Sequence, residues 1–360
     1  MSHKVATLNS SPDSSEERHA GPAESLLGVV LDGNWTVIER LFIDPGIKSR
    51  SRRSCYKAID KQSRPVFIKA FDFRHDDINL EPEELDMYLR EFLNEASIHE
   101  CCKGKKLSRV TRLLGKGKII INGQAVHYLV LEWAGKSLRQ YHPPGDGQIS
   151  LRTRLIGLRD VASSLQQLHN HGIAHQDIKP SNVVLVERSP LKITDLGCTS
   201  CQGFPIPPHD FEFVPGQPNY APYELLYECE DLDWRTRRFG NDIFLLGNLI
   251  YTSFVGASIT ILVLHAIDET LRPNSYGGPY SDIVPQLIQA HHWATDSFLR
   301  DCLPPELASE ICDLVSGLCH PDPKRRGCPR TINRSGSQYD LQRVISRLDI
   351  MAAKASLRSL

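Results

Sequence analysis

The sequence predicts an α+β fold in which a β-rich N-terminal part precedes a larger helical part. Residues 35–38, 54–59 and 65–71 form short, largely apolar runs that are typical of strands. Residues 151–172 instead repeat apolar side chains at spacings of three and four, which predicts a long helix with a glycine stop. A chain of 360 residues suits one large domain with two lobes, or two domains.

The composition is that of an ordinary globular protein, with 41% hydrophobic and 24% charged residues. The net charge of −1 gives no electrostatic reason to expect nucleic acid or an anionic membrane as the main partner. The ten cysteines are scattered, and a chain of this length needs no disulfides, so we expect reduced thiols and a cytoplasmic location. The first ten residues lack the apolar core of a signal peptide.

Residues 243–264 contain no charged side chain and are numerous enough to span a bilayer. One interpretation is a membrane helix, and the other is a buried helix followed by a second apolar segment. Asn248 is polar, and Gly247 and Gly256 weaken a continuous helix, so we favour the second interpretation and predict no stable membrane insertion.

One polar stretch contains side chains that are suited to proton transfer, phosphate binding and metal binding. Residues 175–182 read H-Q-D-I-K-P-S-N, and residues 195–197 read D-L-G. Asp177 can accept a proton from a hydroxyl, and Lys179 can neutralise a phosphate. Asn182 and Asp195 supply hard oxygen ligands that suit Mg²⁺. Short apolar runs beside the stretch predict a hairpin-like support, and phosphoryl transfer depends on positioning and charge neutralisation of this kind.

This stretch resembles the eukaryotic-like Ser/Thr protein kinases, whose pattern is H-R-D-x-x-x-x-N followed by D-F-G. The resemblance implies a bilobal protein-kinase-like fold with a small β-rich N-lobe and a larger helical C-lobe. We expect a disordered tail at 1–27, because it is poor in large apolar residues, the N-lobe at 28–134, the C-lobe at 135–350 and a C-terminal tail at 351–360.

The resemblance also implies an activity, a serine/threonine-protein kinase with ATP and Mg²⁺ as cofactors and a protein as substrate. By the family pattern, Asp177 and Lys179 are the catalytic residues, and Asn182 and Asp195 hold the magnesium. The alternative is a pseudokinase or nucleotide-binding scaffold that acts through protein–protein interaction.

Lys69 lies within the apolar run 65–71, where a buried ammonium is costly unless it is paired. The run resembles the V-A-I-K strand of kinases, which makes Lys69 the phosphate ligand. Residues 83–101 have helical spacing and contain two possible partners, Glu91 and Glu95. We choose Glu95, because its neighbours resemble the family helix more closely. His99, one turn further on, stands where kinases usually have an apolar side chain.

Residues 126–135 resemble the strand and hinge that bind adenine through backbone groups. The resemblance assigns these groups to Glu132 and Ala134. Just before this segment, residues 110–114 and 118–121 have the pattern of two paired strands with the turn at 115–117.

The glycine-rich phosphate loop of the family is the poorest match. Lys48, Arg50 and Arg53 occupy positions where glycines belong. Their side chains limit the approach of backbone N–H groups to phosphates, but their charge can replace those contacts. The two interpretations, a nucleotide-binding basic loop and a solvated basic turn, stay open.

Gln176 replaces the arginine of H-R-D, which in many kinases receives a phosphorylated activation loop. We therefore expect activity that is independent of loop phosphorylation, as in a bacterial-type, non-RD subgroup. Two structural positions also match: Glu224 in the A-P-E-like segment should pair with Arg326, and Asp242 should anchor the catalytic loop from below.

Overall fold

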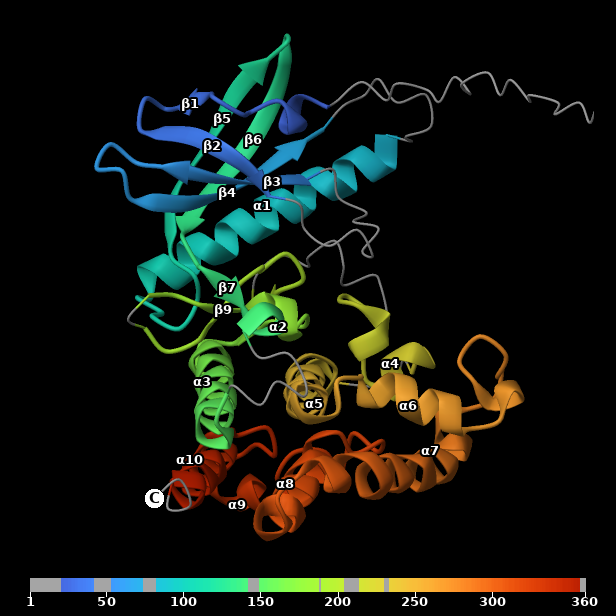
Figure 1. Cartoon of the computed structure of the whole chain (residues 1–360). Coiled ribbons are helices and arrows are strands. Elements are labelled where there is room, and N and C mark those ends of the chain that lie inside the picture. Colours follow the sequence, from blue (N-terminus) through green and yellow to red (C-terminus); the bar gives the residue numbers. More distant parts are fainter. Residues whose placement is uncertain are drawn as a thin grey trace, which may run out of the picture.

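The computed structural model describes residues 21–41, 53–73, 82–141, 149–187, 189–203, 214–229 and 233–356. They form two lobes, a sheet with one long helix and, below it, a helical lobe (Figure 1). This arrangement confirms the predicted α+β, bilobal kinase-like fold. The predicted phosphate-binding residues Lys48 and Arg50 lie outside the described residues, whereas Arg53 lies within them.

The N-lobe is built on a six-stranded antiparallel sheet with the order β1-β2-β3-β4-β6-β5. Its elements are the 3₁₀ helix η1 (Pro22–Glu24), the strands β1 (Val30–Leu31), β2 (Trp35–Leu41), β3 (Arg53–Ile59), β4 (Pro65–Asp72), β5 (Leu113–Ile121) and β6 (Gln124–Glu132), and the helix α1 (Pro82–Gly104).

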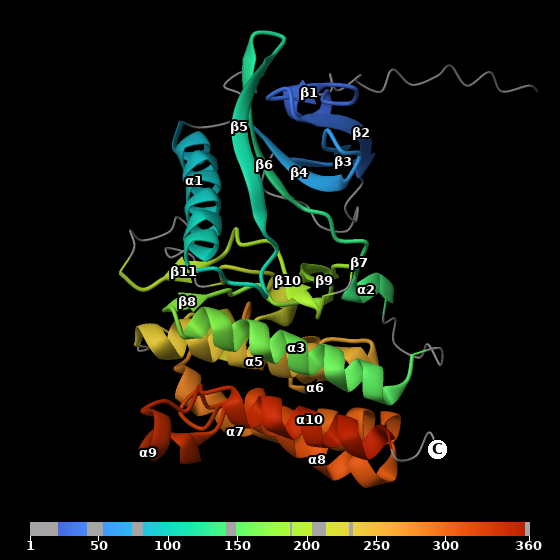
Figure 2. The same cartoon turned by 90° about the vertical axis from the view of Figure 1, so that its left-hand side faces the viewer.

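Helix α1 stands alongside the sheet, as Figure 2 shows. Phe92 of α1 packs edge-on against Phe71 of β4, with ring centroids 4.9 Å apart. Ala96, one turn later, joins the same buried cluster with Leu129 and Leu131 of β6. Burial of these side chains removes apolar surface from water and fixes which face of α1 turns toward the sheet.

The segment 115–117 is not the turn that we predicted, because β5 runs through it as one strand. The turn to β6 falls at Asn122 and Gly123 instead, both of which have positive φ. The two earlier glycines are required by packing: a Cβ on Gly115 would lie 2.5 Å from the ring of Trp35. Close approach of another side chain is thus a second reason for glycine in a strand.

Both predicted tails are shorter than we placed them. Residues 21–27 cover the sheet, with Leu26 fully buried and the Tyr56 hydroxyl donating to the Ala23 carbonyl over 2.6 Å. At the other end, helix α10 continues to Ser356 and buries Met351. A few apolar side chains in otherwise polar segments are enough to dock both ends.

The C-lobe is mainly helical. Its strands are β7 (Lys136–Ser137), β8 (Ile173–Ala174), β9 (Val183–Leu185), β10 (Lys192–Ile193) and β11 (Ser200–Cys201); its helices are α2 (Leu138–Tyr141), α3 (Leu151–His169), α4 (Tyr223–Leu226), α5 (Trp234–Val255), α6 (Ile259–Ala266), α7 (Tyr280–Ala294), α8 (Pro305–Leu318), α9 (Ile332–Ser335) and α10 (Gln342–Ser356). Single turns η2 (Pro180–Asn182), η4 (Pro218–Tyr220), η5 (Glu269–Leu271), η6 (Thr295–Leu299), η7 (Arg300–Cys302) and η8 (Pro329–Thr331) connect them.

Helix α5 forms the centre of this lobe and packs against α3, α6 and α8. The Asp233 side chain caps its N-terminus, and Gly256 ends it with a φ of 88°. Every residue from Arg238 to Ser253 is buried. The predicted apolar run is therefore α5 followed by α6. No single helix in the described chain is long and apolar enough to span a membrane. Helices α5 and α6 reach that length and apolarity only when they are taken together, and they are bent by 86° relative to each other.

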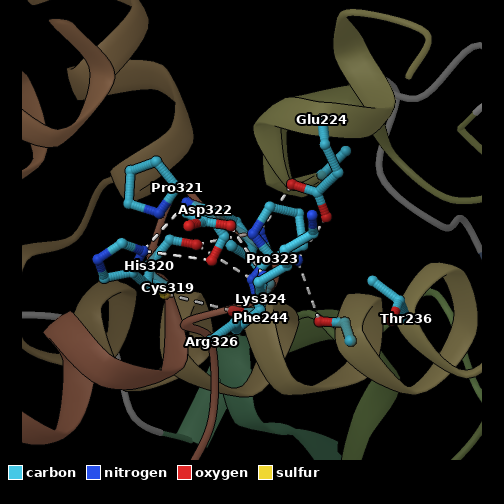
Figure 3. A network of polar contacts seen from close by, with 12 residues as sticks. Glu224, Thr236, Phe244, Cys319, His320, Pro321, Asp322, Pro323, Lys324 and Arg326 are labelled. Atoms are coloured by element: carbon cyan, nitrogen blue, oxygen red, sulfur yellow. Dashed lines mark hydrogen bonds and ion pairs between the residues drawn. The ribbon is translucent and has the colours of Figure 1, made fainter. Parts of the chain in front are cut away.

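The predicted ion pair between Glu224 and Arg326 is present and buried (Figure 3). The Arg326 guanidinium contacts both carboxylate oxygens of Glu224, with Nη2 and Oε2 2.6 Å apart. It also donates to the carbonyl of His320 from Nε and Nη2. These contacts join α4 to the segment after α8 and hold the helix that follows the activation segment.

We predict that Arg326→Met lowers the free energy of unfolding by about 3–5 kcal/mol, because it leaves the Glu224 carboxylate buried without its cation. Urea unfolding followed by circular dichroism measures this change. Glu224→Gln/Arg326→Met should lose less, since no charge is then buried. Arg325→Met, at an exposed neighbouring position, is the control. Equal losses for the single and the double variant would contradict the prediction.

Candidate active site

The first part of the site is a buried ion pair between β4 and α1. The Lys69 ammonium lies 2.7 Å from each carboxylate oxygen of Glu95, and both residues are at most 5% exposed. The predicted pairing with Glu95 has therefore formed. The Phe92 packing explains it, because that contact sets the rotation of α1 and places Glu95, three residues further on, toward the sheet.

Asp195 joins this pair from the C-lobe. Its Oδ1 accepts from Lys69 Nζ over 2.8 Å, and the Arg53 guanidinium lies 3.5 Å from the same oxygen. Burial alone would raise the pKa of Asp195, but Lys69 and Arg53 hold it well below the usual value. Asp195 has a φ of 63°, a conformation that costs a non-glycine residue about 1–2 kcal/mol. The two cations stabilise the carboxylate in this position.

The second part of the site is the catalytic loop. Lys179 Nζ donates to Asp177 Oδ2 over 2.7 Å, and Asn182 Nδ2 donates to the same oxygen over 2.9 Å. The other oxygen of Asp177 accepts from the backbone N–H of Gln217 at 3.2 Å. A Cβ on Gly216 would lie 2.5 Å from the carbonyl of Gln176, so only glycine fits there. The structure thus brings Asp177, Lys179 and Asn182 together.

Asp242 of α5 anchors this loop, as the resemblance predicted. Its carboxylate accepts from the backbone N–H groups of His175 and Gln176 at 2.8 and 2.7 Å, and its Oδ2 lies 2.8 Å from His169 Nε2. On the other side, β9 and β10 form the expected hairpin support. The catalytic loop, residues 175–182, runs from β8 to β9 and is therefore bounded by secondary structure at both ends, which holds Asp177 in position.

Gln176 is a buried connector. Its side-chain amide donates to the carbonyl of Cys198 at 2.7 Å and to Ser200 Oγ at 2.8 Å. Its amide oxygen accepts from Arg238 Nη1 of α5 at 2.6 Å. Gln176 is 1% exposed and has a φ of 67°. A neutral amide therefore joins α5 to residues 198–200, just after the D-L-G stretch, at the position where the family has arginine.

His99 is fully enclosed, and neither ring nitrogen has a hydrogen-bond partner within the described residues. Its Nε2 lies 4.0 Å from Glu95 Oε1. Burial, aided by the Lys69 charge, lowers the pKa of His99 to about 3, so the imidazole is neutral at physiological pH. The register of α1 is the expected one, with a neutral imidazole where the family usually has an apolar side chain.

The predicted hinge groups lie at the end of β6. The Glu132 backbone N–H is occupied, since it donates to the Arg112 carbonyl at 2.9 Å. Its side chain accepts from the Arg112 N–H and pairs with Lys192 of β10 at 2.5 Å. Ala134 is half-buried, two residues beyond the end of β6, and forms no hydrogen bond within the described part of the chain. The Ala134 N–H therefore has no partner among the described residues.

The donor set fits a magnesium ion. Asn182 turns its amide nitrogen toward Asp177, so its Oδ1 has only a 3.3 Å contact from the Ser181 hydroxyl. Lys69 contacts Oδ1 of Asp195 and leaves Oδ2 of that carboxylate for the metal. Mg²⁺ commonly takes one or two protein oxygens and completes its shell with phosphates and water. Among the described residues there is no cluster of three or more His, Cys, Asp or Glu side chains suited to a metal, and all ten cysteines are free thiols.

Comparison with known proteins identifies the family. The family model described as "Protein kinase domain" matches residues 51–335, most of the chain. The chain belongs to the protein kinase domain family.

Individual relatives are distant and longer. The chain is similar to a Wee1-like protein kinase of Arabidopsis thaliana, 31% identical over 134 residues that cover 37% of this chain and 24% of that protein. It is 24% identical over 221 residues to the human hormonally up-regulated neu tumor-associated kinase, covering 60% of this chain and 26% of the relative. A probable serine/threonine-protein kinase of Clostridium perfringens is 24% identical over 159 residues, covering 42% and 22%. The matched part spans about a quarter of these relatives.

Three residues that the sequence did not single out take part in the site. They are Arg238, which contacts Gln176, His169, which contacts Asp242, and Lys192, which contacts Glu132. Arg238 lies 62 positions from Gln176. Only its place near the start of an otherwise apolar helix suggested burial, and a charge there needs a partner.

We predict that Gln176→Arg destabilises the fold by about 3 kcal/mol, because it brings a second cation next to the buried Arg238. Denaturant unfolding measures the loss. Gln176→Met, which removes hydrogen bonds without adding charge, should lose less. The exchange variant Gln176→Arg/Arg238→Gln should recover part of the stability. A single Gln176→Arg variant as stable as the wild type would show that the amide contact is unimportant.

Proposed function

We propose that this protein kinase transfers the γ-phosphoryl group of ATP to a serine or threonine hydroxyl of a protein, with Mg²⁺. The observation that carries the proposal is the simultaneous presence of the Lys69–Glu95 pair, Asp195 beside it, and the Asp177–Lys179–Asn182 group. Names of distant relatives such as the Clostridium protein support the Ser/Thr class.

Each residue has a defined task in this proposal. Lys69, fixed by Glu95, binds the phosphates of ATP. Asp177 orients the substrate hydroxyl and accepts its proton, and Lys179, 2.7 Å from Asp177, stabilises charge on the transferring group. The Glu132 carbonyl and the Ala134 N–H bind the adenine. Positioning of this kind supplies most of the catalysis in phosphoryl transfer.

Asn182 and Asp195 would hold the magnesium. The ion, when bound, neutralises charge on the phosphate oxygens. In the structure Lys69 and Arg53 balance the charge of the Asp195 carboxylate. This carboxylate in turn raises the pKa of the Arg53 guanidinium. Arg53 therefore carries its positive charge next to the place where the phosphates would lie, which favours the nucleotide-binding interpretation of this position over a solvated turn.

We further propose that activity does not require a phosphorylated activation loop. The neutral Gln176 already satisfies the contacts to Cys198, Ser200 and Arg238 through hydrogen bonds. Gln176 itself carries no charge that a phosphate would have to balance. Phosphatase treatment should therefore leave the rate of phosphoryl transfer unchanged.

A scaffold without phosphoryl transfer is the second candidate. It is favoured by the basic residues in place of the glycine-rich loop and opposed by the complete set of catalytic side chains. Binding of Mg-ATP without turnover would distinguish it.

Asp177→Ala should reduce phosphate incorporation into an acceptor protein by at least about 10³-fold, because no group then orients the hydroxyl or accepts its proton. Lys69→Ala should do the same by misplacing the phosphates. Transfer from [γ-³²P]ATP measures both, and the thermal midpoint checks folding. Asp313→Ala, an exposed position on α8, is the control. Unchanged transfer by Asp177→Ala would refute the assignment.

Arg53→Ala should raise the KM for ATP about tenfold with a small effect on kcat, since a charge-assisted contact to the phosphates is lost. Steady-state kinetics at saturating magnesium provide both constants. Arg53→Lys keeps the charge and should recover part of the affinity. An unchanged KM in Arg53→Ala would mean that this residue belongs to a solvated turn.

A further inference from the structure

The molecule has a cavity of about 480 Å³ whose lining includes neither Lys69 nor Asp177. Its walls are the C-terminal end of α1, the segment that leads from α1 to β5, the end of β6 and the β9–β10 hairpin. The backbone joins these parts: Thr111 donates to the Ile193 carbonyl, and Ile193 donates to the Arg109 carbonyl. We call this space the α1–hairpin cavity. Its volume is that of sites which hold small organic ligands.

The rim of the α1–hairpin cavity is cationic. Lys103, Lys106, Arg112 and Lys192 line it, against two acids, Glu132 and Glu187. Lys192 is neutralised by Glu132 at 2.5 Å. The side chains of Lys103, Lys106 and Arg112 are exposed and form no ion pair with any described residue. Three cations at the mouth of one cavity attract an anion.

The buried part of the wall combines apolar side chains with two polar residues, His99 and Thr111. Leu107, Val110 and Leu113 are buried and line the cavity, together with Cys102. His99 lines it as well, with both ring nitrogens lacking a partner in the described structure. Buried polar atoms without partners are rare and are commonly satisfied by a ligand or water. A neutral imidazole offers one donor and one acceptor.

We propose that the α1–hairpin cavity binds a small amphipathic anion, whose acidic group pairs with Lys103, Lys106 and Arg112 and whose apolar body lies against Leu107 and Val110. The occupant would be an organic carboxylate, sulfonate or phosphate. Neither Lys69 nor Asp177 lines this cavity; it shares Glu132 with the proposed nucleotide site, and its residue His99 lies 4.0 Å from Glu95.

The test is a fluorescence titration of the full chain with 8-anilinonaphthalene-1-sulfonate, an aromatic sulfonate that becomes fluorescent in apolar surroundings. We expect saturable binding of one dye molecule per chain. Lys103→Ala/Arg112→Ala should raise the Kd about tenfold or more, because two charged contacts are lost. Ser108→Trp, which fills the mouth without changing charge, should abolish the same component.

The control is Lys105→Ala/Lys118→Ala, an equal change of charge at exposed lysines that do not line the cavity. It should leave the Kd unchanged, and thermal midpoints check that every variant is folded. Absence of saturable binding to the wild type would overturn the proposal, as would a Kd that is the same in all folded variants or that changes as much in the control. None of these results depends on ATP binding or phosphoryl transfer.

Discussion

The ammonium of Lys69 is the interaction on which the site depends. It lies 2.7 Å from Glu95 of α1 and 2.8 Å from Asp195 of the C-lobe, so one charge joins the sheet, the helix and the second lobe. Lys69 and Glu95 are buried and Asp195 is half-buried, and an unpaired charge in such surroundings is costly. The packing of Phe92 on Phe71 makes the arrangement possible, because it fixes the side of α1 that faces Lys69.

The catalytic loop is held by a different kind of interaction. Asp242, from the buried centre of α5, accepts hydrogen bonds from two successive backbone N–H groups of the loop, and Gln176 adds neutral contacts to α5 and to the activation segment. Phosphorylation-controlled members of the family need a phosphate to balance a charge at this position. Here the Gln176 amide makes its contacts without a phosphate, which is the basis of the proposed independence from loop phosphorylation.

The sequence was sufficient where a local pattern carries the chemistry. Residue types at fixed spacings predicted the strand around Lys69 and the hairpin behind Asn182. The choice of Glu95 and the Glu224–Arg326 pair, whose members are 102 positions apart, came from the family resemblance instead. The sequence did not predict features in which a residue's identity is set by a side chain that is distant in sequence. Gly115 resembles a turn residue, yet it is glycine because the ring of Trp35 lies against it.

The other features that the sequence did not predict depend on contacts between residues far apart in the chain. Lys192 and Glu132 are 60 positions apart, and Arg238 and Gln176 are 62 apart, so no local pattern pairs them. The docking of residues 21–27 depends on single side chains such as Leu26, which leave no periodic signal. The cavity beside α1 likewise draws its lining from four separate segments and could not be read from any one of them.

We propose that the closed Lys69–Glu95–Asp195 arrangement belongs to an active phosphotransferase. The most direct measurement follows the wild-type chain with Mg-[γ-³²P]ATP and a generic acceptor protein, with nucleotide binding monitored in parallel by thermal stabilisation. The account predicts stabilisation together with label in phosphoserine or phosphothreonine. Stabilisation by Mg-ATP with no labelled protein would contradict it and would identify a nucleotide-binding scaffold.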